Sequence, residues 1–261
     1  MENIPVVILC GGQGTRLREE TEVKPKPMVE IGGMPIVWHI MKTYAHYGFT
    51  DFILCLGYKG DVIRRFFYEY EMITNDFTIE LGEDNLKVHP KNLEKGWKIT
   101  LVDTGEKTMT GGRVKRIEQY VKGDMFMLTY GDGVIDMDIK KLVEFHKSHG
   151  KLGTVTGVTP ISQYGELAIE GDKVVSFSEK PRNHKSSISG GYFVLNKEFF
   201  TYLSEDEGCV LEHEPLQKLA ENDQLNVYTH DGFWQCMDTY RDYKFLQGLW
   251  DDNQAKWKVW S

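Results

Sequence analysis

The stretch Ile4–Met28, IPVVILCGGQGTRLREETEVKPKPM, decides the fold and predicts where its functional centre lies. An apolar run, Val6–Cys10, leads directly into Gly11, Gly12 and Gly14. This pattern predicts a buried strand that ends in a tight loop. Glycines in such a loop leave backbone N–H groups free to approach an anion closely.

A basic cluster follows the glycines, although the whole chain carries a formal net charge of -8. The cations of this cluster are Arg16, Arg18, Lys24 and Lys26. Pro25 and Pro27 restrict the backbone around Lys26, which therefore holds a defined position. Fixed backbone donors combined with nearby cations suit a polyphosphate.

Other interpretations of the loop are a strand and turn with solvated surface charges, or one of two better-known phosphate motifs. The dinucleotide fingerprint G-x-G-x-x-G does not fit, because Leu17 stands where its third glycine is needed. The P-loop does not fit either, since no Gly-Lys-Ser/Thr follows. The wrong glycine spacing disfavours a dinucleotide oxidoreductase.

The composition fits a globular metabolic enzyme. The 261 residues, 41% of them hydrophobic, suffice for one α/β domain spanning 1–261. The apolar runs have strand length, far below the roughly 20 residues of a membrane helix, so no membrane partner is expected. A pI near 5.5 argues against nucleic acid as a binding partner. Scattered Cys10, Cys55, Cys209 and Cys236 predict reduced thiols in a cytoplasmic protein.

The hydrophobic pattern alternates between strands and helices, which predicts a Rossmann-like, mainly parallel sheet flanked by helices. We expect strands at 51–56, 125–130, 153–159, 190–195 and 225–229, and helices at 35–47, 61–70, 111–120, 138–148, 197–204, 214–221 and 240–250. Short alternating runs at 73–104 predict a β insertion at the sheet edge, and 166–178 a hairpin. The tail 251–261 carries two tryptophans, which predicts that it packs on the body or on a neighbouring subunit.

A carboxylate site is expected at Asp132, directly after the strand pattern MFMLTYG. Ligands bind outside the carboxyl ends of strands in open α/β sheets, and the flanking glycines leave room for a bulky anion. Mg²⁺ that carries phosphates prefers one or two carboxylates, so Asp132 is a candidate ligand; the alternative is a turn aspartate. The pattern leaves Asp136, Asp138 and Asp238 open as a second ligand.

The combination of GGQGTRL with KPKPM resembles the signature of sugar-phosphate nucleotidyltransferases. The continuation VEIGGMPIVWHIMKTYAHYGFTDFILCLGYKGDVI is most similar to the cytidylyltransferases that make CDP-glucose, and the resemblance covers nearly the whole chain. It implies the nucleotide-diphospho-sugar transferase fold, CTP and glucose 1-phosphate as substrates, and Mg²⁺. The resemblance also implies a homo-oligomer, often a hexamer built from trimers, in which the tail could contact a neighbouring subunit.

By this resemblance, the catalytic residues are Lys26, Arg16 and Asp132. The segment GFWQCMDT selects Asp238 as the second metal ligand. The segment TMTGGR is where cytidylyltransferases differ from relatives that use other nucleotides. The residues implied to bind the nucleotide are Leu9, Gly11, Gly12, Gln13, Gly14, Thr15, Arg16, Lys26, Thr108, Arg113 and Gly131.

The acceptor site is expected in the second half of the chain. Lys180, fixed before Pro181, could neutralise the acceptor phosphate; the alternative is a surface ion pair with Glu179. The resemblance implies acceptor contacts from Tyr164, Gly165, Glu179, Lys180, Ser189, Gly190 and Gly191. Where these cytidylyltransferases usually carry asparagine, the chain has Ser189, which lacks an amide donor. This difference leaves open another phosphorylated acceptor, including a non-sugar one.

The expected reaction is an in-line displacement in which the acceptor phosphate attacks the α-phosphorus of CTP and pyrophosphate leaves. Because a phosphate is already ionised at neutral pH, the step depends on alignment and charge neutralisation. A catalytically inactive, nucleotide-binding regulatory homologue is the alternative from another class. The charged residues that such a homologue usually loses, among them Arg16, Lys26 and Lys180, are all present.

Overall fold

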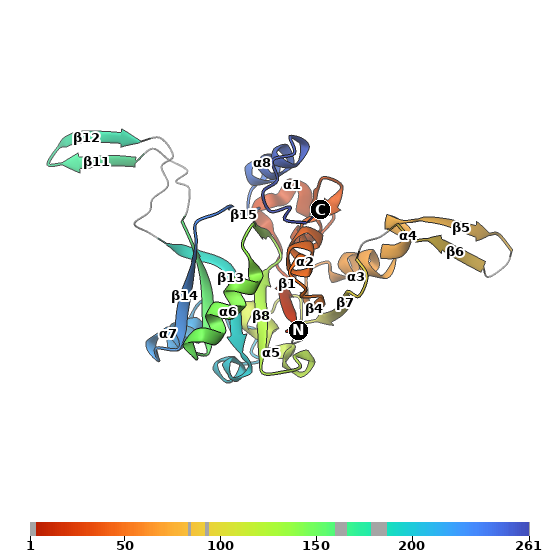
Figure 1. Ribbon diagram of the computed structural model, residues 1–261, viewed down its shortest axis with the longest axis horizontal. Helices are drawn as coiled ribbons and strands as arrows, with labels where there is room; N and C mark the ends of the chain where they lie inside the picture. Colours follow the sequence, from red (N-terminus) through yellow and green to blue (C-terminus); the bar gives the residue numbers. More distant parts are fainter. Residues whose placement is uncertain (1–3, 83–84, 92–93, 160–165, 179–186, 261) are drawn as a thin grey trace.

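A seven-stranded mixed sheet forms the centre of the molecule (Figure 1). The computed structural model describes residues 4–82, 85–91, 94–159, 166–178 and 187–260. In sheet order the strands are β14 (Leu225–His230), β10 (Gly153–Val158), β13 (Ile188–Asn196), β8 (Met125–Tyr130), β1 (Val6–Leu9), β4 (Asp51–Leu56) and β7 (Lys98–Asp103). Only β13 runs antiparallel to its neighbours, β8 and β10. The predicted mainly parallel α/β sheet is confirmed.

Helices cover both faces of this sheet, because residues in the central strands alternate between two buried clusters. In β1, Val6 and Ile8 face one cluster, while Val7 and Leu9 face the other. The first cluster packs against α2 (Ile36–His46), α3 (Gly60–Tyr68), α6 (Ile139–His149) and α8 (Tyr240–Asp251). The second packs against α5 (Thr110–Arg116), the 3-10 helix η4 (Lys197–Tyr202) and α7 (Glu214–Glu221).

The remaining helices are short. They are α1 (Arg18–Thr21), α4 (Tyr70–Thr74) and the 3-10 helices η1 (Thr15–Leu17), η2 (Lys26–Met28) and η3 (Glu118–Tyr120). The helix expected at 111–120 is therefore split between α5 and η3, and the one expected at 197–204 is a 3-10 helix. Asp138 caps α6 through the backbone N–H groups of its first turn, and Gly150 ends it at a φ of 67°.

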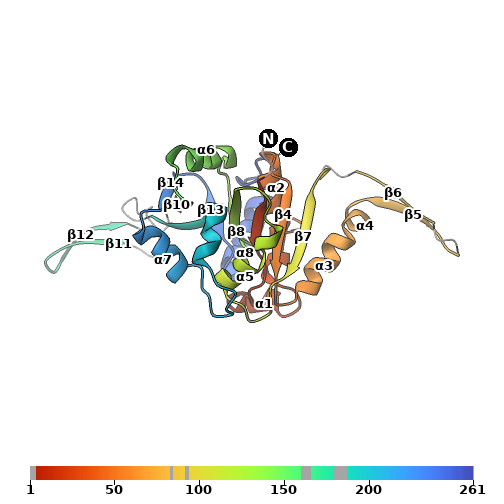
Figure 2. The same ribbon diagram turned by 90° about the horizontal axis from the view of Figure 1, so that it is seen from below.

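Four small two-stranded ladders surround the sheet. They pair β2 (Glu30–Ile31) with β3 (Met34–Pro35), β5 (Asp76–Glu80) with β6 (Asn85–His89), β9 (Gly133–Ile135) with β15 (Trp234–Cys236), and β11 (Glu166–Glu170) with β12 (Lys173–Ser178). The hairpins β5–β6 and β11–β12 extend away from the central sheet on opposite sides of the molecule (Figure 1 and Figure 2).

The β insertion expected at 73–104 is smaller than predicted. Only the β5–β6 hairpin leaves the sheet, whereas β7 is its edge strand and pairs in parallel with β4 from Asp51↔Lys98 to Leu56↔Asp103. The short alternating pattern did not distinguish the two cases, because an edge strand that is half covered alternates like a hairpin strand. Ile99 and Leu101 pack against the first cluster and tie β7 to the body.

The C-terminal tail packs on the body of its own chain. Trp257 is fully buried, stacks on Phe233 at 5.6 Å between ring centroids, and donates its indole N–H to His39 Nδ1 at 3.4 Å. Burial lowers the pKa of His39 to about 4, so this ring is neutral. An additional contact between the tail and a neighbouring subunit stays a prediction.

No helix within the described ranges is long and apolar enough to cross a membrane. The cysteines are free thiols, and Cys10 and Cys55 are buried in the core.

Trp257→Ala should lower the free energy of unfolding by about 3–5 kcal/mol, because it empties a fully buried aromatic site. Urea denaturation followed by tryptophan fluorescence or circular dichroism measures the change. Tyr68→Ala is the control, since this side chain is 88% exposed. Equal denaturation midpoints for Trp257→Ala and the wild-type protein would show that the tail does not stabilise the body.

Candidate active site

A cavity of about 350 Å³ opens at the carboxyl ends of β1 and β8. It is lined by Leu9, Cys10, Gly11, Gly12, Gly14, Thr15, Arg16, Lys26, Pro27, Thr108, Met109, Thr110, Arg113, Tyr130, Gly131, Asp132 and Asp238. The cavity thus lies where ligands bind in open α/β sheets. Of the residues predicted to bind the nucleotide, all line it except Gln13, which is exposed on the loop.

The glycines of the loop meet specific geometric demands. Gly14 has a φ of 62°, in the left-handed region that favours glycine. A Cβ on Gly131 would lie 2.8 Å from the carbonyl oxygen of Leu9 and 3.0 Å from Pro27 Cγ. The loop after β1 and the loop after β8 can therefore approach each other only because Gly131 has no side chain.

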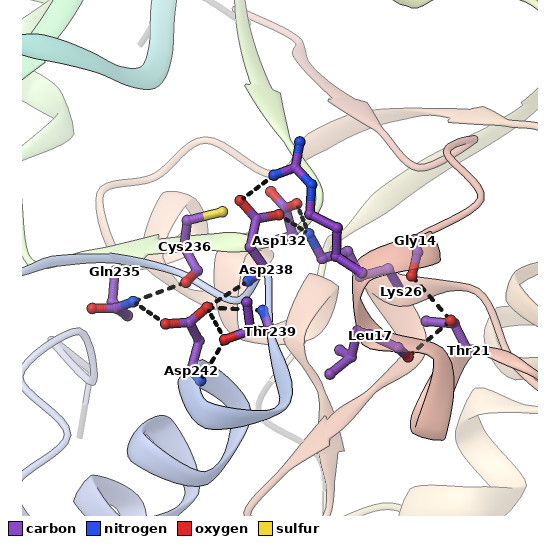
Figure 3. A network of polar contacts seen from close by, with 11 residues as sticks. Gly14, Leu17, Thr21, Lys26, Asp132, Gln235, Cys236, Asp238, Thr239 and Asp242 are labelled. Carbon is purple, nitrogen blue, oxygen red and sulfur yellow. Dashed lines mark hydrogen bonds and ion pairs between the residues drawn. The ribbon is translucent and has the colours of Figure 1, made fainter. Parts of the chain in front are cut away.

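Lys26 connects two carboxylates that are far apart in the sequence (Figure 3). Its Nζ donates to Asp132 Oδ2 at 2.6 Å and to Asp238 Oδ1 at 2.5 Å. Burial acts to lower the pKa of Lys26, but the charge of Asp132 and the hydrogen bonds to both carboxylates raise it to about 12. The ammonium group is therefore charged at neutral pH and shares its charge between two partners.

The carboxylate of Asp238 pairs with two cations, Lys26 and Arg16. Burial acts to raise its pKa, but the hydrogen bond and charge of Lys26, with the charge of Arg16, bring it below the usual value. Arg16 reaches Asp238 Oδ2 with Nη1 at 3.2 Å from a largely exposed position. Asp242 accepts the backbone N–H groups of Asp238 and Thr239 and forms a capping box that begins α8 (Figure 3).

The donor set at this point fits a divalent cation. One ligand atom each from Asp132, Cys236 and Asp238 lie within 4.8 Å of one another. Two carboxylates are the donors that Mg²⁺ prefers. Cys236 was not considered as a ligand in the sequence analysis; burial raises the pKa of its thiol, so the two carboxylates are the donors of this set that suit Mg²⁺.

The other two carboxylates considered from the sequence have structural partners. Asp138 caps α6. Asp136 Oδ1 accepts the backbone N–H of Phe233 at 2.8 Å and lies 2.8 Å from His230 Nε2. The structure therefore brings Asp238, and neither of these two, beside Asp132.

Arg113, predicted to contact the nucleotide, mainly holds the walls of the cavity. Its Nη1 donates to the carbonyl oxygens of Leu56 and Gly105 at 3.0 and 2.7 Å and to Thr104 Oγ1 at 2.9 Å. Its Nη2 donates to the carbonyl oxygens of Gly11 at 3.0 Å and Glu106 at 3.2 Å. The buried guanidinium thus ties the glycine loop to the ends of β4 and β7.

The predicted acceptor residues are only partly described. Tyr164, Gly165, Glu179 and Lys180 lie outside the described residues. The other three, Ser189, Gly190 and Gly191, are part of β13 and do not line the cavity.

The start of β13 is nevertheless linked to the carboxylates. Ser189 Oγ accepts the backbone N–H of Gly191 at 3.3 Å. The carbonyl oxygen of Gly190 accepts the indole N–H of Trp234 at 2.8 Å, and Trp234 lies on β15, two residues before Cys236. Gly191 has a φ of 77°, and a Cβ there would lie 2.6 Å from the Tyr130 ring.

Arg113→Lys should lower the free energy of unfolding by about 1–3 kcal/mol, because one ammonium group leaves buried carbonyl oxygens without donors. It should also speed amide hydrogen exchange in the glycine loop after β1. Urea denaturation and exchange mass spectrometry measure both effects. Arg64→Lys is the matched control, since Arg64 is exposed and, within the described ranges, donates one long hydrogen bond of 3.4 Å to Leu101 O. Wild-type exchange of the loop in Arg113→Lys would contradict this role.

Comparison with known proteins agrees with this geometry. The nucleotidyl transferase family model matches residues 5–252. The glucose-1-phosphate cytidylyltransferase of Salmonella typhi is 51% identical over 255 residues, covering 97% of this chain and 98% of the relative. The mannose-1-phosphate guanyltransferase of Saccharomyces cerevisiae is 32% identical and is covered over 63% of its length, by 93% of this chain.

Among solved structures, HddC from Yersinia pseudotuberculosis superimposes with a TM-score of 0.68 at 25% identity, covering 95% of this chain and 99% of HddC. Both the sequence and the architecture therefore lead to one assignment: the chain belongs to the nucleotidyl transferase family.

Proposed function

We propose that the protein condenses CTP with α-D-glucose 1-phosphate to give CDP-glucose and pyrophosphate. The observation that carries this proposal is the placement of Lys26, Asp132 and Asp238 at one cavity beside a glycine loop. The choice of substrates follows the 51% identical relative, a glucose-1-phosphate cytidylyltransferase, which the chain matches over almost its full length.

The proposed chemistry is a direct displacement. An oxygen of the acceptor phosphate forms a bond to the α-phosphorus of CTP, and the bond from this phosphorus to the β-phosphate oxygen breaks. The electron pair leaves with pyrophosphate, and no general base is needed because the attacking phosphate is ionised. The backbone of the glycine loop and Arg16 would hold the triphosphate. Lys26 would offset the charge on the pentacoordinate phosphorus.

Asp132 and Asp238 are the residues that would hold Mg²⁺, and their spacing supports this assignment. A bound ion would neutralise charge on the phosphate oxygens. Lys26 already uses one oxygen of each carboxylate, so it lies next to any ion held there and next to the phosphates that such an ion attracts.

The same transfer to a different phosphorylated acceptor is the second candidate. Ser189 is the residue that supports this second candidate. The hydroxyl of Ser189 accepts the backbone N–H of Gly191, and the side chain has no amide group to donate to a sugar. Lys180 stays the predicted acceptor-phosphate contact. A cytoplasmic location and a homo-oligomer also stay predictions.

Lys26→Ala should lower turnover by about 10²–10³-fold, the usual effect of removing one electrostatic donor to a transition state. Initial rates of pyrophosphate release, with folding checked by circular dichroism, measure this. Lys24→Ala is the control, because Lys24 pairs with Glu30 and does not line the cavity. If folded Lys26→Ala turned over at the wild-type rate, Lys26 would have no part in the chemistry.

A pyrophosphate-release screen of four nucleoside triphosphates against a panel of phosphorylated acceptors tests the substrates. We expect CTP with glucose 1-phosphate to give the highest kcat/KM. Faster reaction with another acceptor would favour the second candidate, while the absence of turnover with every pair would favour a regulatory homologue.

A further inference from the structure

An exposed carboxylate next to the cavity, on the side of α5, contacts two of the lining residues and has no part in the proposed chemistry. Glu212, in the segment before α7, accepts the hydroxyl proton of Tyr130 with Oε1 and that of Thr110 with Oε2, the latter at 2.7 Å. Tyr130 and Thr110 both line the cavity. One carboxylate therefore binds two hydroxyl groups of the same wall.

This arrangement fixes where the hydroxyl protons point. A hydroxyl group has one proton to donate and two lone pairs that accept. Because both protons are directed at Glu212, Tyr130 and Thr110 can offer only lone pairs to a ligand. Thr110 Oγ1 also accepts the backbone N–H of Leu211 at 2.9 Å, which holds it in place. Burial, followed by the charge of Glu212, raises the pKa of Tyr130, so its hydroxyl keeps the proton.

The position of this wall fits the base of a nucleotide. Tyr130 packs against the cluster on the α5 face of the sheet, whereas Lys26 and the two carboxylates lie beside η2 and β15. A triphosphate on the glycine loop and Lys26 would leave the α5 side for the base. Met109, 47% exposed and also lining the cavity, offers an apolar surface for a planar ring.

We propose that Glu212 is a positioning residue that makes this wall accept hydrogen bonds only, and thereby selects cytosine over uracil. Cytosine presents an exocyclic amine, a donor, at the position where uracil presents a carbonyl oxygen, an acceptor. The amine of cytosine can donate a hydrogen bond to the lone pairs of the two hydroxyl groups. The carbonyl oxygen of uracil would face the same lone pairs, with no proton available to form a hydrogen bond. This inference rests on the proposed use of CTP and adds the residue responsible for it.

Glu212→Gln tests the inference, because an amide can accept one hydroxyl proton but donates to the other hydroxyl, which then turns its proton toward the cavity. The ratio of kcat/KM for CTP to that for UTP should fall by about tenfold or more. Isothermal calorimetry of CTP and UTP binding without acceptor should show that the ratio of their affinities falls in the same way. Glu214→Gln, two residues away and paired only with Lys218 among the described residues, is the control.

Tyr130→Phe is the second variant, in case Glu212→Gln does not fold. This substitution keeps the aromatic ring against Gly191 but removes the hydroxyl that accepts the hydrogen bond. It should therefore also lower the ratio of kcat/KM for CTP to that for UTP. A wild-type ratio in the folded variant would overturn the role of Glu212 while leaving the proposed function intact. A wild-type enzyme that uses UTP as well as CTP would overturn both.

Discussion

The contact of Lys26 with Asp132 and Asp238 is the constraint on which the site depends. Asp132 lies 106 residues after Lys26 in the sequence, and Asp238 lies 212 residues after it. A separate part of the structure must therefore bring each carboxylate to Lys26. Gly131 lets the loop after β8 approach the loop after β1. The capping box at the start of α8 fixes Asp238. An unpaired carboxylate or ammonium in this half-buried place would be costly, so the three groups require one another.

Support for this contact extends to the C-terminal part of the chain. Gln247 on α8 accepts the backbone N–H of Gly32 at 3.1 Å, and a Cβ on Gly32 would lie 1.9 Å from Trp250 Nε1. The β2–β3 turn, which follows η2 directly, is thereby pressed against α8. Arg113 does the equivalent on the other face, where it holds the glycine loop. The cavity is thus braced from both faces of the sheet, by α8 on one face and by Arg113 on the other.

Much of this was predictable where the signal is local. The strand before the glycines, the helices α2, α6 and α8, and the position of Asp132 just after β8 all follow from periodicity and turn residues. The same signals did not show that the helix expected at 111–120 is split or that the one expected at 197–204 is a 3-10 helix. Asp238 needed the family resemblance, because its approach to Asp132 depends on the pairing of β15 with β9. Arg113 lines the cavity, and its contact with the nucleotide stays a prediction, whereas Glu212 was not considered. The contacts of both residues go to backbone carbonyls and hydroxyls of distant segments, which have no signature in the sequence.

The claim that Asp132 and Asp238 together hold the divalent ion is tested most directly by Mn²⁺ binding. Electron paramagnetic resonance of free Mn²⁺, with CTP present and acceptor absent, gives the affinity of the protein once the binding of Mn²⁺ to CTP alone has been measured and subtracted. The account predicts that Asp132→Asn and Asp238→Asn each weaken binding by more than about 10-fold, whereas Asp136→Asn, whose carboxylate faces Phe233 and His230, does not. Wild-type Mn²⁺ affinity in either of the first two variants would contradict it.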